Sequence, residues 1–426
     1  MTLPVMWLLL TAALVLFMTP GLAFFYGGLV KSKSVISMMM LSFGSIGLVG
    51  VLWVLYGFNQ AFVDGTSNDW IPEVLGNPFS DFGLQDAAKA AFEGGDGGAA
   101  AGVVLASAIF GATFAIITVA LISGSIADRA RFWPWMLFAG VFATLVYFPV
   151  ASWVFAFVVN EDGSTTFTGW VGQLGAHLGF DVSTIDFAGG TAVHINAGAA
   201  ALALAIVLGK RKVGFSKEEA QPHNVPLVLI GTAILWFGWF GFNGGAATAD
   251  GQVGLIFVNT MVAPAAALVG WIVVEHFKEG KATAVGAASG IVAGLVAITP
   301  ACANLSPIWA IVLGFVAGGV CAVTIELKYK IGIDDSLDVV GIHLVAGFIG
   351  TLYLGFFAID TGLFTGGNID QLIVQAIPAV AIAAYSFVMA FVIGTVIEKT
   401  IGFRAKEEDE IAGIDLALHG EGYAIN

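Results

Sequence analysis

The sequence predicts an all-α polytopic membrane protein. Of the 426 residues, 58% are hydrophobic and only 11% are charged, whereas soluble domains carry about 25% charged residues. Many apolar runs reach about 18 residues or more, and a helix of about 20 residues crosses a bilayer. The alternation of apolar and polar residues that is typical of a transmembrane β-barrel is absent from the sequence. We therefore expect a bundle of membrane-spanning helices.

Hydropathy divides the chain into eleven expected spans. They cover residues 4–30, 34–62, 99–127, 132–158, 187–209, 225–244, 252–277, 283–301, 305–327, 338–358 and 371–398. The chain contains 56 Gly, and small residues let membrane helices approach each other closely. Residues 1–403 are expected to form one membrane domain, which a polar cytoplasmic tail at 404–426 follows.

The basic residues predict how these spans are oriented. Lys and Arg follow the first, third, fifth, seventh, ninth and eleventh spans, and of the 16 Lys and Arg only Lys89 falls on the other side. Cytoplasmic loops of membrane proteins are enriched in Lys and Arg. We therefore expect the N-terminus outside and the C-terminus inside. One span more or fewer would scramble this segregation.

The first long loop on the expected outer side is strongly acidic. Against the single Lys89, residues 63–98 contain Asp64, Asp69, Glu73, Asp81, Asp86, Glu93 and Asp96. An acidic mouth would concentrate cations, although loops that are merely solvated would have the same composition. Both interpretations remain open at this point.

Composition and motifs exclude several classes of function. The formal net charge of −14 is opposite in sign to that of a nucleic-acid-binding protein. Walker A and Rossmann motifs are missing, and no nucleophile–base pair indicates an enzyme. Cys302 and Cys321 are expected near opposite membrane faces, and zinc-type Cys/His spacing is missing. We therefore expect no disulfide, no metal site and no cofactor.

Two similar stretches place a histidine inside an apolar span. Both read His, an apolar residue, a variable position, Ala and Gly: His194-Ile-Asn-Ala-Gly198 and His343-Leu-Val-Ala-Gly347. An ionisable side chain within a membrane span indicates a functional site. The alternative is a pair of core histidines whose hydrogen bonds are satisfied internally.

The two histidines occupy matching places in the predicted topology. Each lies in the fifth span of its half, residues 1–209 and 225–358, and span 371–398 follows both halves. Because five is odd, the two halves would insert with opposite orientation. This inverted five-helix repeat is a common transporter architecture, with the pathway between the halves near the midplane.

Longer motifs surround these histidines and recur along the chain. They are Asp186-Phe-Ala-Gly-Gly-Thr-Ala-Val-His194, Gly238-Trp-Phe-Gly-Phe-Asn-Gly-Gly245, Ala297-Ile-Thr-Pro-Ala301, Ala127-Asp-Arg-Ala-Arg-Phe132 and Asp338-Val-Val-Gly-Ile-His343. Together they resemble the signature of the ammonium transporter family (Amt/Mep/Rh), in its Amt branch, over essentially the whole chain. The resemblance implies a homotrimer in the plasma membrane, with one pore through each eleven-helix subunit. It also implies ammonium or ammonia as the substrate, with methylammonium as an analogue.

By this resemblance, His194 and His343 are the paired histidines that line the pore. Two neutral imidazoles can share one hydrogen bond and still offer a donor and an acceptor to a small guest. Moving a bare ammonium ion into an apolar interior costs tens of kcal/mol by idealised solvation estimates. Removing its proton at neutral pH costs only about 3 kcal/mol, for an amine pKa about two units above 7. We therefore expect ammonium to lose its proton and to cross as ammonia, and potassium ions to be excluded because they have no proton to lose.

The resemblance also identifies aromatic residues at the outer mouth. Phe114 and Phe242 correspond to stacked phenylalanines that gate the pore, Phe110 belongs to the same wall, and Trp239 is a further pore-lining position. Aromatic faces attract cations, although lipid contact or core packing would also explain each ring. Thr299 is implied to lie near the outer vestibule, where its hydroxyl could equally bond its own helix.

Two positions depart from the pattern of the family. Its external recruitment site usually has a Trp where this chain has Phe155, and a Ser hydroxyl where this chain has Ala246. A Phe face holds a cation less well than Trp does, and Ala offers no acceptor. We therefore expect weaker external binding, unless Trp153 or Trp170 substitutes.

Asp186 and Asp338 open the two histidine-bearing spans. The simplest role for both is helix capping, in which a carboxylate accepts hydrogen bonds from free backbone N–H groups. The resemblance is compatible with that role, because it implies that Asp186 acts by holding the backbone of the vestibule.

The polar tail contains the acidic run Glu407-Glu-Asp-Glu410. Such runs are usually solvated and disordered, but this tail resembles one that packs beneath a neighbouring subunit and couples the pores. The resemblance also implies a PII-type signalling protein at the cytoplasmic face. Two alternatives to transport remain: an ammonium sensor that transports little, and a neutral-gas channel of the Rh type.

Overall fold

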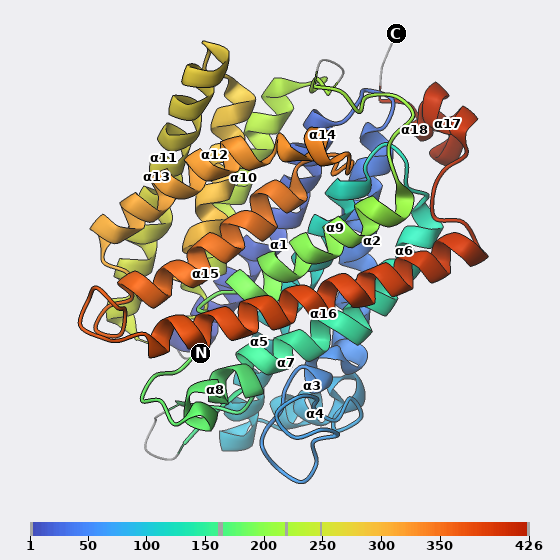
Figure 1. Cartoon of the computed structure of the whole chain (residues 1–426). Helices are drawn as coiled ribbons and strands as arrows, with labels where there is room; N and C mark the ends of the chain where they lie inside the picture. The colour runs from blue at the N-terminus through green and yellow to red at the C-terminus, as the bar shows by residue number, and fades with distance from the viewer. Residues whose placement is uncertain (1–2, 161–164, 218–219, 248, 424–426) are drawn as a thin grey trace.

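The computed structural model describes residues 3–160, 165–217, 220–247 and 249–423, and it is almost entirely helical (Figure 1). The first half contains α1 (Leu3–Leu29), α2 (Val35–Leu52), η1 (Trp53–Gly57), α3 (Phe58–Gln60), η2 (Phe82–Leu84), α4 (Gln85–Glu93), α5 (Gly95–Ile122), η3 (Ser123–Ile126), α6 (Phe132–Phe142), η4 (Ala143–Tyr147), α7 (Phe148–Phe155), β1 (Phe157–Val159), β2 (Thr165–Phe167), α8 (Trp170–Leu178), η5 (Gly190–Ile195) and α9 (Asn196–Leu208). The second half contains α10 (Val225–Gly244), α11 (Asp250–Glu279), α12 (Ala284–Ile298), α13 (Pro307–Thr324), α14 (Leu327–Ile331), η6 (Val340–Leu344), α15 (Val345–Phe357), α16 (Asp370–Thr400), α17 (Glu407–Ala412) and α18 (Ile414–His419).

Within the described residues, ten helical segments are long and apolar enough to cross a membrane. They match ten of the expected spans to within a few residues. The remaining expected span, 283–301, corresponds to the shorter apolar helix α12. The all-helical membrane fold predicted from composition is therefore confirmed, with ten of the eleven expected spans found as helices long enough to cross a membrane.

The helices pack in pairs that are distant in sequence. α1 lies along α10, and α9 lies along α16. The histidine-bearing elements meet as well, because α15 contacts η5 and α9 contacts η6. The chain therefore brings the fifth and the tenth predicted spans together, as the echo between their sequences indicates.

The segments at one end of the bundle are more structured than loops. The acidic stretch at 63–98 contains α4, and α5 begins at Gly95, four residues before the predicted start at 99. The second connection forms a hairpin, in which Phe157 pairs with Phe167, and then α8. Figure 1 shows α4 and α8 at the same end of the molecule. The Trp170 N–H at the start of α8 donates to the Glu73 carbonyl at 3.0 Å and joins the two connections.

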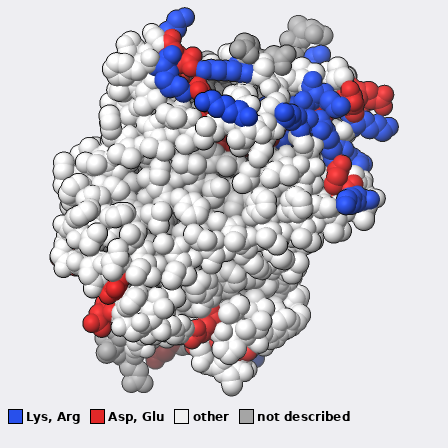
Figure 2. Space-filling view, in the orientation of Figure 1, with Lys and Arg blue, Asp and Glu red and all other residues white. Residues whose placement is uncertain are grey.

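Basic side chains gather at the opposite end of the molecule. Figure 2 shows Lys and Arg at the end that carries α14 and α17, and acidic residues at both ends. A buried network lies there: Arg211 bonds Asp334 through Nε at 2.9 Å and Asp128 through Nη1 at 3.0 Å. Arg129 is fully buried and donates to the Asp334 carbonyl at 2.6 Å. Burial lowers the pKa of Arg129 to about 10. Burial alone would raise the pKa of Asp334, but the two arginines hold it below its usual value.

The tail is ordered against the body of its own subunit. Arg404 donates to the carbonyls of Leu208 and Lys210 at 2.8 and 2.7 Å. The Asp415 carboxylate accepts hydrogen bonds from the backbone N–H groups of Ile36 and Ser37 at 3.0 and 2.7 Å, so it caps the start of α2. The predicted tail extends to residue 426, but its last three residues lie outside the described part of the chain.

Candidate functional site

Both histidines lie in π-helical turns. His194 belongs to η5 and His343 to η6, and each turn passes directly into an α-helix. π-Helical turns are rare in proteins overall, and many of those that occur lie at functional sites. Both rings are buried, with exposed fractions of 1% and 4%.

The Asp186 carboxylate holds the beginning of the first histidine-bearing helix. It accepts hydrogen bonds from the backbone N–H groups of Gly189, Thr191 and Ala192 at 3.1, 2.9 and 3.2 Å, and also from Gly190 and the Thr191 hydroxyl. These groups would otherwise lack partners at a helix N-terminus. Burial raises the pKa of Asp186, and the hydrogen bonds from Thr191 and its neighbours oppose that shift.

The second histidine-bearing helix is capped by a different residue from the one that the sequence pattern predicts. The Asp335 carboxylate, not that of Asp338, accepts from the N–H groups of Val339 and Val340 at 3.1 and 2.7 Å. Asp338 has a positive φ of 61° and pairs with Lys328 at 2.7 Å. The backbone turn at Asp338 carries its carboxylate away from the helix end. The prediction of capping by Asp338 is therefore wrong, and Asp335 fills that role.

The two histidines meet across the centre of the bundle. Their Nδ1 atoms are 3.2 Å apart, and their ring centroids are 5.3 Å apart. Glycines allow this crossing: a Cβ on Gly198 would lie 2.5 Å from the Leu344 nitrogen, and one on Gly347 would lie 3.0 Å from Ile195. Each glycine thus admits the residue that follows the other histidine. This reciprocal contact explains the Gly that ends both sequence echoes.

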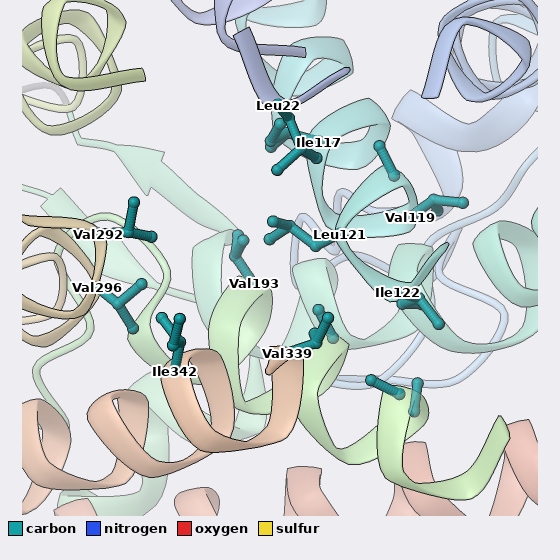
Figure 3. Close-up of a cluster of buried hydrophobic side chains, with 14 of the residues drawn as sticks. Leu22, Ile117, Val119, Leu121, Ile122, Val193, Val292, Val296, Val339 and Ile342 are labelled. Atoms are coloured by element: carbon teal, nitrogen blue, oxygen red, sulfur yellow. The ribbon is translucent and has the colours of Figure 1, made fainter. Parts of the chain in front are cut away.

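A small cavity adjoins the histidine pair. It offers about 10 Å³ to the centre of a water-sized molecule, which is about the space that one such molecule requires. Apart from His194, His343 and Trp239, only apolar side chains line it. Figure 3 shows part of this apolar environment, including Leu22 of α1 and Val292 of α12. The site therefore suits a single small, neutral guest.

A stack of phenylalanines adjoins this cavity through Phe242, which is part of its lining. The rings of Phe114 and Phe242 lie 4.1 Å apart at an angle of 17°, and Phe110 packs edge-on against Phe114 at 4.8 Å. Phe242 also lies 6.0 Å from the His194 ring. The structure thus brings together the aromatic residues that the sequence motifs identify.

Trp239 and Thr299 are joined beside the histidines. The Trp239 ring lies nearly parallel to that of His194 at 5.4 Å, and its indole N–H donates to the Thr299 hydroxyl at 2.8 Å. That hydroxyl in turn donates to the Leu295 carbonyl of its own helix at 2.7 Å. Thr299 therefore bonds its own helix and the indole at the same time.

The two departures from the expected recruitment site have different surroundings. Phe155 ends α7, and its ring meets Phe114 edge-on at 6.2 Å. Trp153 instead packs against Trp170 and Tyr385, at 5.8 and 4.9 Å. Neither tryptophan takes the place of Phe155 beside the phenylalanine stack.

Ala246 follows the end of α10 and is half-buried. Its methyl group cannot accept a hydrogen bond. The adjacent Gly245 is close to the phenylalanine wall, since a Cβ at that position would lie 2.4 Å from the Phe110 ring. Ala246 therefore lies near the aromatic residues without adding a polar group to them.

Comparisons with known proteins agree with this arrangement. The model of the ammonium transporter family matches residues 6–423. The ammonium transporter of Mycobacterium tuberculosis is 48% identical over 97% of this chain and 88% of the relative, and that of Bacillus subtilis is 43% identical over 96% and 95%. Among solved structures, a protein named Sensor Amt Protein aligns with a TM-score of 0.84 at 26% identity over 98% of both chains. Candida albicans Mep2 aligns with a TM-score of 0.80 at 30% identity over 98% of this chain and 90% of its own. The chain therefore belongs to the ammonium transporter family and is a multi-pass membrane protein that transports ammonium and is not an enzyme.

Proposed function

We propose that ammonium loses its proton behind the Phe114–Phe242 stack and crosses the twin-histidine section as ammonia. The observation that supports this most directly is the small apolar cavity of about 10 Å³ beside His194 and His343. Its lining offers no carboxylate to a cation. An ammonium ion would lose its hydration there without a charged partner, which is far more costly than losing a proton.

The paired rings give the neutral guest a polar path. In two neutral imidazoles whose Nδ1 atoms share one hydrogen bond, one donor and one acceptor remain for ammonia. His194 Nε2 is buried and makes no hydrogen bond with a described residue. Trp239, stacked on this ring, holds its orientation. His194 and His343 are thus the pore-lining pair in this proposal, and Phe114 and Phe242 are the gate.

The recruitment vestibule comprises Phe110, Phe155, Ala246, Trp239 and Thr299, and Trp239 also lines the histidine cavity, so it forms the inner limit of the vestibule. Its aromatic rings attract a cation through their faces, and the acidic stretch at 63–98 raises the local cation concentration. Asp186 acts structurally, through the backbone that it caps, because its carboxylate is occupied by the N–H groups of η5.

The full topology comprises eleven spans, with α12 as the eighth. The N-terminus lies outside and the C-terminus inside, because the Lys and Arg collect at the end that carries α14 and α17 (Figure 2), and cytoplasmic loops are enriched in these residues. Two inverted halves, about 1–209 and 225–358, precede the span at 371–398 within the membrane domain 1–403. The contact of α1 with α10, the first helices of each half, supports this division.

Three subunits form the transporter, and residues 404–426 act as a regulatory tail. The basic side chains around α14 and α17 offer an anionic protein surface a docking site, and a PII-type signalling protein is the expected partner. The contact of Asp415 with α2 gives tail movements a direct route to a membrane helix.

A sensor with little transport is the second candidate. Phe155 and Ala246 weaken the recruitment site, and the structure named Sensor Amt Protein is similar over 98% of this chain. The two candidates differ in flux, because a sensor would bind ammonium without moving it.

Uptake of methylammonium into proteoliposomes tests both candidates. His194→Leu and His343→Leu should each lower the maximal rate at least tenfold, whereas His276→Leu, which changes an exposed histidine, should leave it unchanged. Wild-type flux from both pore variants would overturn the twin-histidine path, and a wild-type protein that binds without flux would favour the sensor. Charge measured per ammonia transported shows whether the proton follows, since zero current at full flux excludes coupled proton transfer.

A further inference from the structure

We propose that Gln375 is a positioning residue. Through its hydrogen bonds to the segment before Asp186 and to α15, it fixes the relative position of the two histidine-bearing helices. It lies on α16, a helix that contributes no side chain to the histidine cavity. Its side chain is fully buried. This assignment rests on the proposed twin-histidine path, because it concerns how that path is held in place.

The Gln375 amide forms hydrogen bonds with both backbone polar groups of Ile185. Its Oε1 accepts from the Ile185 N–H at 2.7 Å, and its Nε2 donates to the Ile185 carbonyl at 2.7 Å. Ile185 immediately precedes Asp186. The amide therefore fixes the backbone from which the capping carboxylate projects.

The same amide also reaches the other histidine-bearing span. Nε2 donates its second hydrogen to the carbonyl of Thr351 at 3.1 Å, and Thr351 lies on α15, two turns beyond His343. Oε1 accepts a second hydrogen bond from the Gln371 side chain at 3.2 Å. A glutamine amide has two donors and two acceptor sites, and all four are used here.

Neighbouring contacts secure the same segment. The Thr184 hydroxyl donates to the Val374 carbonyl at 3.0 Å, and Gln371 donates to the Ser183 carbonyl at 3.1 Å. Residues 183–185 are thus held along the first turns of α16. Gln375 is the one whose side chain bonds both this segment and α15.

An apolar side chain at position 375 would leave the partly buried N–H and carbonyl of Ile185 without these partners, which is unfavourable. The segment would then move toward water or toward other partners, and Asp186 would move with it. Because the Asp186 carboxylate accepts hydrogen bonds from the N–H groups at the start of η5, the His194 ring would shift relative to His343. The expected result is a slower maximal rate with little change in half-saturation, since the recruitment aromatics keep their own contacts.

The Gln375→Glu substitution distinguishes a loss of these hydrogen bonds from a simple loss of packing. A carboxylate still accepts a hydrogen bond from the Ile185 N–H. It has no hydrogen to donate to the carbonyls of Ile185 and Thr351. When it is protonated, it regains one donor. Because position 375 is fully buried, the pKa of the new carboxyl should lie well above its ordinary value. Gln375→Glu should therefore recover activity as pH falls, and Gln375→Leu should not.

The experiment compares the full-length Gln375→Leu, Gln375→Glu and Tyr385→Phe proteins with wild type in proteoliposomes. Tyr385→Phe is the matched control, because it removes a different hydrogen bond of α16, the one to Leu145. Methylammonium uptake at pH 8 and pH 6 is divided by the wild-type rate at the same pH. We expect Gln375→Leu to lose at least fivefold in maximal rate at both pH values. Gln375→Glu should lose as much at pH 8 and regain at least half of it at pH 6, and Tyr385→Phe should match wild type.

Two results would overturn the assignment: a wild-type maximal rate from Gln375→Leu, or a Gln375→Glu ratio that does not change with pH. If Gln375→Leu does not fold, the pH ratio of Gln375→Glu alone decides. Failure here leaves the twin-histidine path intact, because that path is judged by the His194 and His343 variants. Conversely, if those variants retain flux, a pH-dependent Gln375→Glu would still show control of transport from α16.

Discussion

Replacing Gly198 by Ala should separate the two histidines. The added Cβ would lie 2.6 Å from the Leu344 Cβ, about 1 Å closer than an ordinary contact between carbon atoms. The helices must move apart to relieve it. The Nδ1 atoms of His194 and His343, now 3.2 Å apart, would exceed hydrogen-bond distance after a displacement of only about half an ångström.

The expected cost of this overpacking is about 1–3 kcal/mol, offset in part by about 1 kcal/mol that Ala gains over Gly within a helix. We expect the protein to fold but its methylammonium uptake to fall about tenfold. Gly47→Ala is the matched control, because a Cβ at that position of α2 has no heavy atom within 4 Å. Equal uptake by the two variants, at equal amounts of folded protein, would refute the reasoning.

Three further changes test other parts of the structure. Ala246→Ser supplies the missing hydroxyl and should lower the half-saturation concentration for methylammonium; an unchanged value would place recruitment elsewhere. Burial raises the pKa of Asp335 to about 6, above the value of about 3.9 in an unfolded chain, so the folded protein retains this proton and loses stability as pH rises from about 4 to about 6. Asp335→Asn should remove that loss in thermal unfolding measured between these pH values, and an unaltered pH profile would contradict it. Asp415→Ala removes the cap of α2, worth about 1 kcal/mol, and should speed proteolytic cleavage of the tail; cleavage at the wild-type rate would show that other contacts hold it.

Hydropathy predicted most of the fold because each membrane helix is a continuous apolar run. Hydropathy predicted the helix boundaries less well where a helix begins or ends in a polar stretch. Gly95, for example, begins α5 inside a polar stretch. In the same way, α8 is a short element whose first residue, Trp170, donates its N–H to the Glu73 carbonyl of the loop at 63–98.

The sequence identified residues that the structure brings together, but not the contacts between them. The echo around His194 and His343 marks both rings, yet nothing local in sequence shows that Gly198 meets Leu344, a contact across 146 positions. The cap at Asp335 escaped prediction because it depends on the positive φ at Asp338, a backbone feature of the folded chain.

Trp153 and Phe155 illustrate the same limit at the vestibule. They are two residues apart on the last turn of α7, so their side chains point about 200° apart around the helix. Only one of them could face Phe114, and composition favours neither. The helix direction within the bundle, set by distant packing, decided for Phe155.

The π-helical turns that carry the histidines also determine how the capped start of each helix is rotated relative to the rest of that helix. A π turn holds one residue more than an α turn, and each residue of an α-helix advances about 100° around the axis. Loss of a single residue from η5 would convert it to α-helix and turn its capped end by that angle relative to α9. Asp186 could then keep its hydrogen bonds to the N–H groups of η5 only if the Ile185 backbone, which Gln375 holds, moved as well. The length of this turn is therefore under the same constraint as the identity of its histidine, and a one-residue deletion there should be as damaging as losing His194.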